Sequence, residues 1–277
     1  MKRRAVVKAG LAAGFALLST AQTAFAASGS DLADRANAGW FRATAELISV
    51  QPQAVVKSSG GSALMVSGFA QARANGVFAV SSHPDRDRMA KFAAEMPSFH
   101  RPWVIRVRGT VSADDVAARH GLNTVDHRDL TALPASDYRP LIGSPAGVII
   151  RRVDGSAAAT FLDIAVAATG VPTDSVRNQF IPEVFDSPTA SPYLVYVDGK
   201  QVASALGVRS GDTVLPVYLF TRPEYAGHGY DVLATSAALR DAFTHGADLA
   251  VAPADPSTRP ILDALHFRTV DTWTTFS

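Results

Sequence analysis

The 277-residue sequence contains no cysteine, which excludes disulfides, thiolate metal sites and a cysteine nucleophile. Its seven histidines form no His-x-His or His-x-x-x-His pair, so we predict no metal site. The formal net charge is only +1, and no basic block follows the first ten residues. Without a basic surface to follow a phosphate backbone, we expect no nucleic-acid partner.

The first 26 residues are typical of an export signal. A basic head with Arg3 and Arg4 precedes the apolar run Ala9 to Leu18, and Ala24-Phe25-Ala26 has the small residues of a cleavage site. The paired arginines resemble a twin-arginine signal, which implies export of the folded protein to the periplasm or the exterior. An uncleaved membrane anchor is the alternative, although the run is shorter than the ~20 residues of a span. After cleavage we expect no stable membrane insertion; if the signal does not function, the protein stays cytoplasmic.

The rest of the chain alternates strand patterns with helical patterns, which predicts an α/β (α+β) fold with helices on both faces of a mixed sheet. Asp198-Gly199 lies between two strand patterns and indicates a β-hairpin. The predicted helices are 28–47, 85–96, 112–120, 156–169, 174–185 (with an irregularity at Pro182), 230–245 and 257–265. The predicted strands are 54–57, 63–69, 76–81, 103–108, 147–153, 193–197, 201–209, 214–221, 247–253 and 268–276, and a connector covers 133–145.

The sequence repeats itself at an offset of 145 residues. His120 to Asp126, HGLNTVD, matches Leu265 to Asp271, LHFRTVD. Without a gap, the same offset lays the strand Val104 to Val107 over Leu249 to Ala252. It also lays one predicted helix start, Ser112, over another, Ser257. Agreement of strand, helix and loop indicates a degenerate duplication.

Two glycines flank a histidine in the stretch Arg222 to Asp231, RPEYAGHGYD, between a predicted strand and a predicted helix. At Gly227 and Gly229 the absence of side chains lets main-chain N–H groups approach an anion. The following helix directs its unpaired amides and the positive end of its dipole to the same point. A simple turn is the alternative, but the position between strand and helix suits a pyrophosphate.

The segments EYAGHGYDVLATSAAL and DPSTRPILDALHFRTVDTW, with the order of elements from Gly147 to Ser277, resemble the GCN5-related N-acetyltransferase (GNAT) family. The resemblance implies the GNAT fold, a mixed and mostly antiparallel sheet flanked by helices. It also implies transfer of an acetyl group from acetyl-CoA to an amine of a small molecule or peptide. Through the repeat, Trp40 to Leu133 resembles a degenerate second copy, which predicts tandem GNAT-like domains at 30–135 and 145–277.

The resemblance further implies that strand 214–221 splays from strand 247–253 and that the pantetheine of CoA enters the gap. The residues implied in cofactor binding are Tyr218, Leu219, Phe220, Glu224, Tyr225, Ala226, Gly227, His228, Gly229, Tyr230 and Asp255. Main-chain groups at 218–220 would face pantetheine and the acetyl carbonyl, and 224–230 would hold the pyrophosphate. Glu224 departs from the Gln or Arg of the family and brings a negative charge toward the phosphate. The amino-terminal copy has no Gly-x-Gly, so only the carboxyl-terminal copy would bind CoA.

Catalysis requires a base for the amine and stabilisation of the departing thiolate. As catalytic residues we predict Glu183, which would orient or deprotonate the amine, and Tyr218, whose hydroxyl would serve the thiolate; a solvated helix end and core packing are the alternatives. The resemblance places Leu262 where relatives have a proton-donating Tyr, and leucine cannot donate a proton. Another group or water serves instead, or the reaction has been lost.

Two functions of different classes follow from these observations. The first is an acyl-CoA-dependent N-acyltransferase, most simply an N-acetyltransferase. The second is an exported GNAT-like protein that binds without catalysis, because acetyl-CoA is not normally available outside the cytoplasm. Binding of CoA is common to the first function and to a CoA-sensing form of the second.

Overall fold

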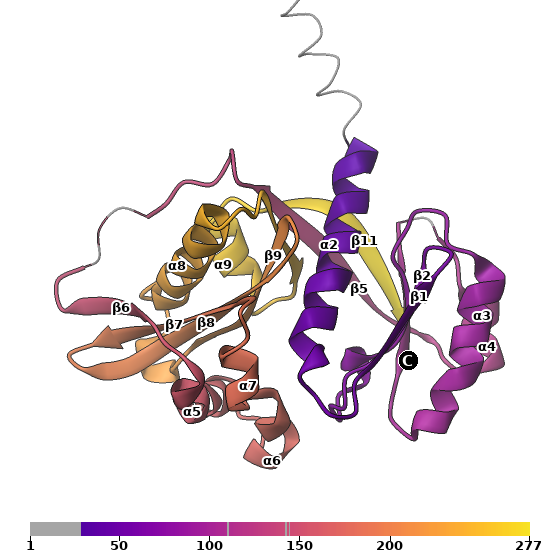
Figure 1. Ribbon diagram of the computed structural model, residues 1–277, viewed down its shortest axis with the longest axis horizontal. Coiled ribbons are helices and arrows are strands. Elements are labelled where there is room, and N and C mark those ends of the chain that lie inside the picture. Colours follow the sequence, from indigo (N-terminus) through magenta and orange to yellow (C-terminus); the bar gives the residue numbers. More distant parts are fainter. Residues whose placement is uncertain (1–28, 110, 142, 144) are drawn as a thin grey trace, which may run out of the picture.

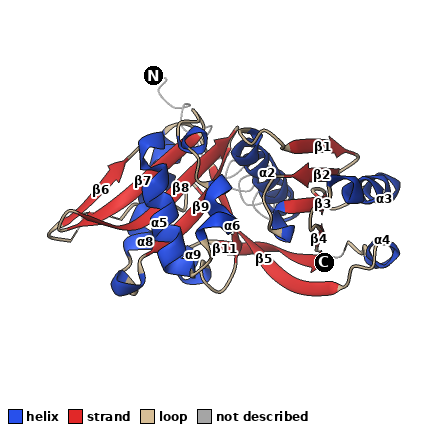
Figure 2. Ribbon diagram, turned by 90° about the horizontal axis from the view of Figure 1, so that it is seen from below, coloured by secondary structure: helices blue, strands red, loops and turns tan. Residues whose placement is uncertain are grey.

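The computed structural model describes residues 29–277 except 110, 142 and 144, so the predicted signal at 1–26 lies outside the described residues. All eleven strands of the described chain form one sheet, in the order β1-β2-β3-β4-β11-β5-β10-β9-β8-β7-β6. The sheet runs across the molecule from β6 at one end to β1 at the other (Figure 2). The pairs β3–β4 and β9–β10 are parallel and the others antiparallel. The predicted mixed, mostly antiparallel sheet is confirmed.

The amino-terminal half opens with one long helix and continues with five strands. Helix α2 has Asp31 in its first turn, where an acidic side chain interacts favourably with the helix dipole. In chain order, this half contains α2 (Gly29–Ser49), β1 (Val55–Ser59), β2 (Ser62–Val66), a 3₁₀ turn (Ala72–Ala74), β3 (Asn75–Ala79), α3 (Arg86–Glu95), a 3₁₀ turn (Met96–Phe99), β4 (Val104–Arg108), α4 (Asp114–Arg119) and β5 (Thr124–Pro134).

The carboxyl-terminal half places three antiparallel strands before a long helix. The hairpin predicted at Asp198-Gly199 is confirmed, and both residues have the positive φ of a tight hairpin turn. This half contains β6 (Val148–Arg152), a 3₁₀ turn (Gly155–Ala157), α5 (Ala158–Thr169), α6 (Thr173–Val176), a 3₁₀ turn (Arg177–Gln179), α7 (Pro182–Phe185), β7 (Ala190–Val197), β8 (Lys200–Ser210), β9 (Thr213–Thr221), a 3₁₀ turn (Pro223–Tyr225), α8 (Tyr230–Thr244), β10 (Leu249–Ala254), α9 (Arg259–Ala264) and β11 (Arg268–Phe276).

Strands β5 and β11 join the two halves. The first pairs with β10 and β11, and the second pairs with β5 and β4, so each reaches the other half (Figure 1). Where β5 and β11 meet, Arg128 lies opposite Trp273, and 273 − 128 = 145 is the offset of the repeat. Such equivalent residues meet where a two-fold axis relates two copies. The geometry supports the proposed duplication, while the boundaries 30–135 and 145–277 stay a prediction because both halves share one sheet.

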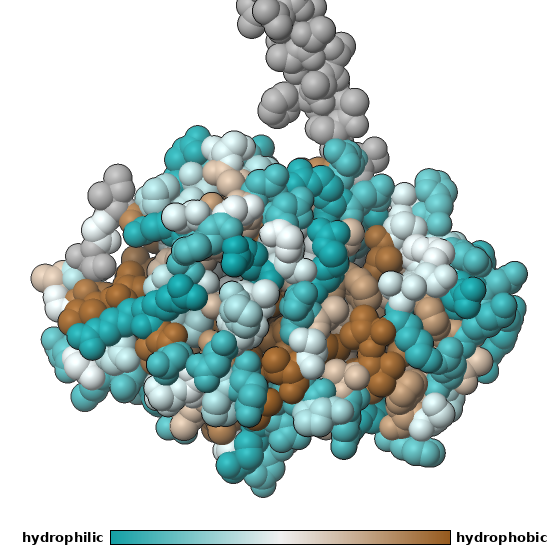
Figure 3. All heavy atoms as spheres, viewed as in Figure 1, coloured by the Kyte–Doolittle hydropathy of each residue, from teal (hydrophilic) through white to brown (hydrophobic). Residues whose placement is uncertain are grey.

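The core lies on both faces of this sheet. Along β10, Leu249 and Val251 face a cluster with α2 and α5, whereas Ala250 and Ala252 face α8 and α9. Helices α3 and α4 cover the β2–β4 end of the second face. Helix α2 comes close to the start of β9 because Gly39 has no side chain: a Cβ there would lie 2.6 Å from Thr213. In the space-filling view, apolar side chains gather near the middle of the face (Figure 3).

Some predicted elements differ from the structure. The helix predicted at 174–185 is divided into α6, a 3₁₀ turn and α7, and Pro182, which lacks an N–H, opens the last piece. Residues Thr124–Pro134 form β5, where we predicted no strand and placed a connector from 133. The helices predicted from Ser112 and Ser257 begin two residues later, at Asp114 and Arg259, still 145 residues apart.

Among the described residues, no single helix has the length and apolar content to cross a membrane. The segments Gly155–Thr169 and Thr173–Gln179 meet both criteria only in combination, and their axes are bent by 118°. Their apolar residues Phe161, Ile164 and Ala165 are buried in the core.

Candidate functional site

Strand β9 leaves its parallel neighbour β10 soon after both begin. They pair only at Thr213 with Leu249 and at Val214 with Ala250. On its other side, β9 has a register shift against β8 between the pairs Ser204–Phe220 and Leu206–Val217. The shift falls on Tyr218, whose φ of +56° is unusual for a residue with a side chain. The predicted divergence of these two strands is therefore present.

The bulge at Tyr218 is fixed by contacts on both sides. The Ser204 hydroxyl donates to the Tyr218 carbonyl oxygen at 3.0 Å. The Tyr218 phenol donates to the Gln179 carbonyl oxygen at 3.1 Å, and its ring lies 4.7 Å from that of Phe180. Burial raises the pKa of Tyr218 above its ordinary value, so the phenol stays neutral. These contacts fix the backbone bulge and leave the phenol bonded to the main chain.

The loop after β9 exposes main-chain groups at the start of α8. Gly227 and Gly229 have φ values of +80° and +72°, which favour glycine. A Cβ built at either would meet nothing within 4 Å, so the space above both is open. Helix α8 begins at Tyr230, and the first amides of a helix have no acceptor within it. The Val232 amide donates to the Asp231 carboxylate at 2.8 Å, and the amides before it, at the open turn, are suited to an anion.

The side chains of the loop surround this open turn. The rings of His228 and Tyr230 are stacked with centroids 5.6 Å apart, and Tyr225 lies 6.3 Å from Tyr230. Glu224 and Ala226 are exposed. On β9, Leu219 packs toward the α8 face and Phe220 toward the α2 face, so the two alternate across the sheet. The structure brings the predicted residues 218–220 and 224–230 together at the end of β9.

Asp255 and Leu262 lie beyond the end of β10. Asp255 accepts hydrogen bonds from the main chain of Ser257 and Thr258, both at 2.9 Å. Burial alone would raise the pKa of Asp255, but these bonds and the nearby Arg128 outweigh it and lower the pKa. Leu262 lies on α9 and is fully buried in the core. Asp255 is thus an ionised group that shapes the turn before α9, and the buried Leu262 has no group that can donate a proton.

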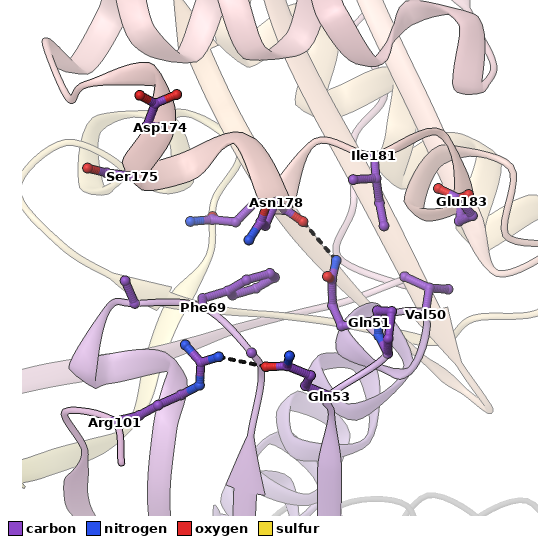
Figure 4. Close-up of a pocket in the computed structure, with 14 residues that line it drawn as sticks. Val50, Gln51, Gln53, Phe69, Arg101, Asp174, Ser175, Asn178, Ile181 and Glu183 are labelled. Atoms are coloured by element: carbon purple, nitrogen blue, oxygen red, sulfur yellow. Dashed lines mark hydrogen bonds between the residues drawn. The ribbon is translucent and has the colours of Figure 1, made fainter. Parts of the chain in front are cut away.

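A cleft of about 610 Å³ opens between the two halves beside the bulge. Asp174, Ser175, Asn178, Ile181 and Glu183 line one wall, and Val50, Gln51, Gln53, Phe69 and Arg101 line the facing wall (Figure 4). Gln179 also lines it, and the carbonyl of this residue holds the Tyr218 phenol. One hydrogen bond, from Tyr218 to Gln179, therefore connects the bulge directly to the lining of the cleft.

Side chains of the amino-terminal half hold the two walls together. The Gln51 amide donates to the Asn178 carbonyl oxygen at 2.8 Å, and the Gln71 amide to that of Ser175 at 2.9 Å. The side-chain oxygen of Gln71, Oε1, is buried without a hydrogen-bond partner among the described residues. The wall formed by the amino-terminal half was not predicted, because its residues come from loops without a motif.

Glu183 lies in the first turn of α7 and is exposed on the wall of the cleft. Its position is open to a polar ligand, as the predicted role requires. Among the described residues, no group of three or more His, Cys, Asp or Glu side chains is placed to hold a metal ion.

Comparisons with known proteins identify the fold and a domain family. Residues 146–250 match the family model described as an acetyltransferase (GNAT) domain. No curated protein matches the chain. A GCN5-related N-acetyltransferase from Kribbella flavida superposes with a TM-score of 0.63 at 20% identity, covering 84% of this chain and 94% of that one.

Two further solved structures resemble most of the chain. A tandem GNAT protein from the clavulanic acid biosynthesis pathway has a TM-score of 0.54 at 15% identity, with coverage of 81% and 83%. A GCN5-related N-acetyltransferase-like protein from Streptococcus suis has a TM-score of 0.54 at 14% identity, with coverage of 91% and 98%. At these identities, likeness shows the fold. The chain has the GNAT fold, and its residues 146–250 match the model of the GNAT acetyltransferase domain, a family whose members transfer an acyl group from CoA to an amine.

Proposed function

We propose that the protein binds acetyl-CoA between β9 and β10 and transfers its acetyl group to an amine held in the cleft between the halves. The observation that carries the proposal is the bulge at Tyr218, which lies where β9 leaves β10 and is followed by the open turn at Gly227 and Gly229. A strand that loses its neighbour offers main-chain groups to an extended ligand such as pantetheine.

The open turn supplies the second part of the cofactor site. Its amides and the dipole of α8 would bind the pyrophosphate, and His228 adds a side chain that carries positive charge when protonated. Glu224 is exposed and is free to turn away from the phosphate. The glycines matter for backbone conformation and for keeping the space above them empty.

The acceptor amine would enter the cleft on the bulge side. Glu183 is the carboxylate that we assign to orient the ammonium and to take its proton as nitrogen attacks the thioester carbonyl. Main-chain N–H groups at the bulge would stabilise the oxyanion that develops there. The C–S bond then breaks, and the thiolate of CoA leaves and takes a proton from water, because Leu262 cannot supply one.

A matched pair of glycine variants tests the cofactor site. Gly227→Glu places a carboxylate in the open space where the pyrophosphate would lie. Gly199→Glu is the control, because Gly199 has a φ of +79° and equally open surroundings but lies in the β7–β8 turn. Each substitution should cost about 1 kcal/mol of folding stability through its positive φ.

Calorimetry with acetyl-CoA then separates the two variants. We expect affinity to fall by about hundredfold in Gly227→Glu, through charge repulsion and lost space, and to stay unchanged in Gly199→Glu. Equal affinities in both variants, or no binding of acetyl-CoA by the unmodified protein, would exclude the proposed site.

A CoA-binding protein without catalysis is the second candidate function. It is favoured by the fully buried Leu262 and by the phenol of Tyr218 being bonded to a main-chain carbonyl. Release of free thiol from acetyl-CoA in the presence of an amine panel distinguishes the candidates: transfer releases thiol in proportion to acetylated amine, and binding alone releases none.

Export is also a proposal. It rests on the sequence of residues 1–26, which lie outside the described residues. Replacing Arg3 and Arg4 by lysines should retain the protein in the cytoplasm, because twin-arginine transport requires the paired arginines. Unchanged amounts of the variant outside the cytoplasm, measured by cell fractionation, would argue against this route.

A further inference from the structure

Two arginines on β4 lie on the same face of the sheet and differ in their partners. Arg108 is buried and pairs with Asp271 at 2.7 Å and with Asp34. Arg106, two residues earlier, is also buried, with 7% of its surface exposed. Within the described chain no carboxylate pairs with Arg106, and its guanidinium has no hydrogen-bond acceptor. Among the described residues, Arg108 therefore has two carboxylate partners and Arg106 has none.

Aromatic rings take the place of an anion around Arg106. Its guanidinium carbon lies 4.9 Å from the ring centroid of Trp273, 5.4 Å from that of Trp40 and 5.5 Å from that of Phe78. These contacts are favourable for a cation, but they do not neutralise its charge. A buried charge without an opposite charge is costly, so the position has a strong preference for an anion.

Two more arginines adjoin this aromatic cage. Arg128 lies on β5 directly opposite Trp273 of β11, and Arg73 lies in the 3₁₀ turn before β3. They share one carboxylate, Asp126, at 3.2 Å and 3.4 Å. Burial, together with the positive charges of Arg128 and Arg73, lowers the pKa of Arg106 to about 9. The three guanidiniums thus raise the local positive potential around one another.

The charge of this arginine cluster is not balanced. Arg73, Arg106 and Arg128 carry three positive charges, and Asp126 carries one negative charge. Asp255 adds a second negative charge 3.8 Å from Arg128. With both carboxylates counted, one positive charge remains, which a monoanion such as a carboxylate would neutralise. The planar fork of a guanidinium also matches a carboxylate in shape.

The cluster lies on the same sheet as the proposed reaction site, and β10 separates β9 from β5, the strand of Arg128. Asp255 follows β10, the strand from which β9 diverges, and Arg128 connects Asp255 to Asp126. Trp40 and Trp273 belong to the cluster of apolar side chains on the α2 face, which Tyr218 and Phe220 also contact. An anionic group bound at the cluster would therefore lie on the same face of the sheet as the bulge.

We infer that Arg73, Arg106 and Arg128 form a carboxylate-binding site whose occupant is a carboxylate of the acyl acceptor. The acceptor would then be an amino acid or a peptide with a free carboxyl group, its amine directed to the bulge. The identity of the occupant rests on the proposed function, whereas the anion site itself does not.

The anion site is tested without CoA. Two of the three tryptophans flank Arg106, so their fluorescence reports on the cage. We expect sodium propionate to produce a saturable change, with sodium chloride at equal ionic strength producing none. Arg106→Met should abolish the response, and Arg106→Lys, which keeps the charge but loses the fork, should weaken binding about tenfold.

Arg108→Met is the matched control. It removes a buried guanidinium from the same strand and face, so it should lower the melting temperature yet keep the propionate response. Arg106→Met should melt at the temperature of the unmodified protein or above it, because no carboxylate loses its partner. No response in the unmodified protein, or an equal response in Arg106→Met, overturns the site. Tighter binding of inorganic phosphate than of propionate overturns its assignment to a carboxylate.

The occupant is tested by turnover with amino acids and the corresponding amino acid amides. We expect kcat/KM to favour the free acid at least tenfold (about tenfold per lost charge-assisted contact), and the preference to disappear in Arg106→Met. Equal rates for acid and amide in the unmodified protein overturn the assignment to the acceptor. A propionate response in a protein that binds no acetyl-CoA would instead refute the proposed function and leave the anion site standing.

Discussion

The two parallel strand pairs of the sheet, β9–β10 and β3–β4, differ in how much room they leave. After two paired positions, β9 runs on to Thr221 with a bulge at Tyr218. In the other half, β3 pairs with β4 through Phe78 and ends one residue later. The first pair therefore leaves most of β9 without its parallel neighbour, whereas β3 has β4 beside it almost to its end.

Glycines show the same contrast. A Cβ at Gly227 or Gly229 would meet nothing within 4 Å, whereas a Cβ at Gly76 of β3 would lie 2.0 Å from the Val104 carbonyl oxygen. In one half, glycine keeps a loop open; in the other, it lets two strands pack without a gap. One fold thus keeps its parallel strand pair in both halves, while only the carboxyl-terminal half retains space for a ligand.

The largest effect, on folding stability, is expected where an added methyl group would overlap a neighbouring strand. Gly76→Ala should destabilise the protein by about 3 kcal/mol, because the new methyl group forces β3 away from β4. Gly121→Ala, at a positive φ but with open surroundings, should cost only about 1 kcal/mol. Urea unfolding measures both, and equal costs would show that the β3–β4 packing is less tight than described.

The next effect concerns catalysis by the carboxyl-terminal half. Glu183→Gln should lower kcat/KM by about hundredfold, since the amine loses its proton acceptor. Asp174→Asn is the control, because it removes a second exposed carboxylate of the same cleft without touching α7. A similar loss in both variants would mean that the cleft acts through its overall charge and not through Glu183.

The smallest effect concerns the phenol at the bulge. Tyr218→Phe loses the hydrogen bond to Gln179 and should cost about 1 kcal/mol of stability, with less than about a tenfold change in turnover. Burial raises the pKa of Tyr218, so its contribution is complete below the unfolded pKa of about 10 and is lost as the pH rises further.

Unfolding measured between pH 8 and pH 11 checks this dependence. The unmodified protein should lose stability above about pH 10, and Tyr218→Phe should lose less. A hundredfold loss of turnover in the variant would instead return the phenol to the role of proton donor.

Much of the fold could be predicted from local signals. The tight turn at Asp198-Gly199 and the helix that begins at Tyr230 follow from rules that act within a few residues. The repeat located α4 and α9 relative to each other, because an offset survives the loss of individual residues. Strand β5 was not predicted because charged side chains at 126–129 interrupt its apolar pattern, and its pairing with β10 and β11 is a long-range property.

The part of the site that has a local sequence pattern was predicted, and the part that depends on long-range contacts was not. The loop at 224–230 has a local pattern, and the structure brings it together with the bulge. The second wall of the cleft was not predicted, because Gln51, Phe69 and Arg101 meet Glu183 only when the two halves join. Nor does sequence distinguish Arg106 from Arg108, since their partners come from α2, β3 and β11.

The most direct test of the difference between the two halves is the stoichiometry of acetyl-CoA binding. Titration calorimetry of a chain that begins after Ala26 should give one site per chain, since only β9–β10 leaves space for the cofactor. Two sites per chain, or one site whose affinity is unchanged in Gly227→Glu, would contradict the account.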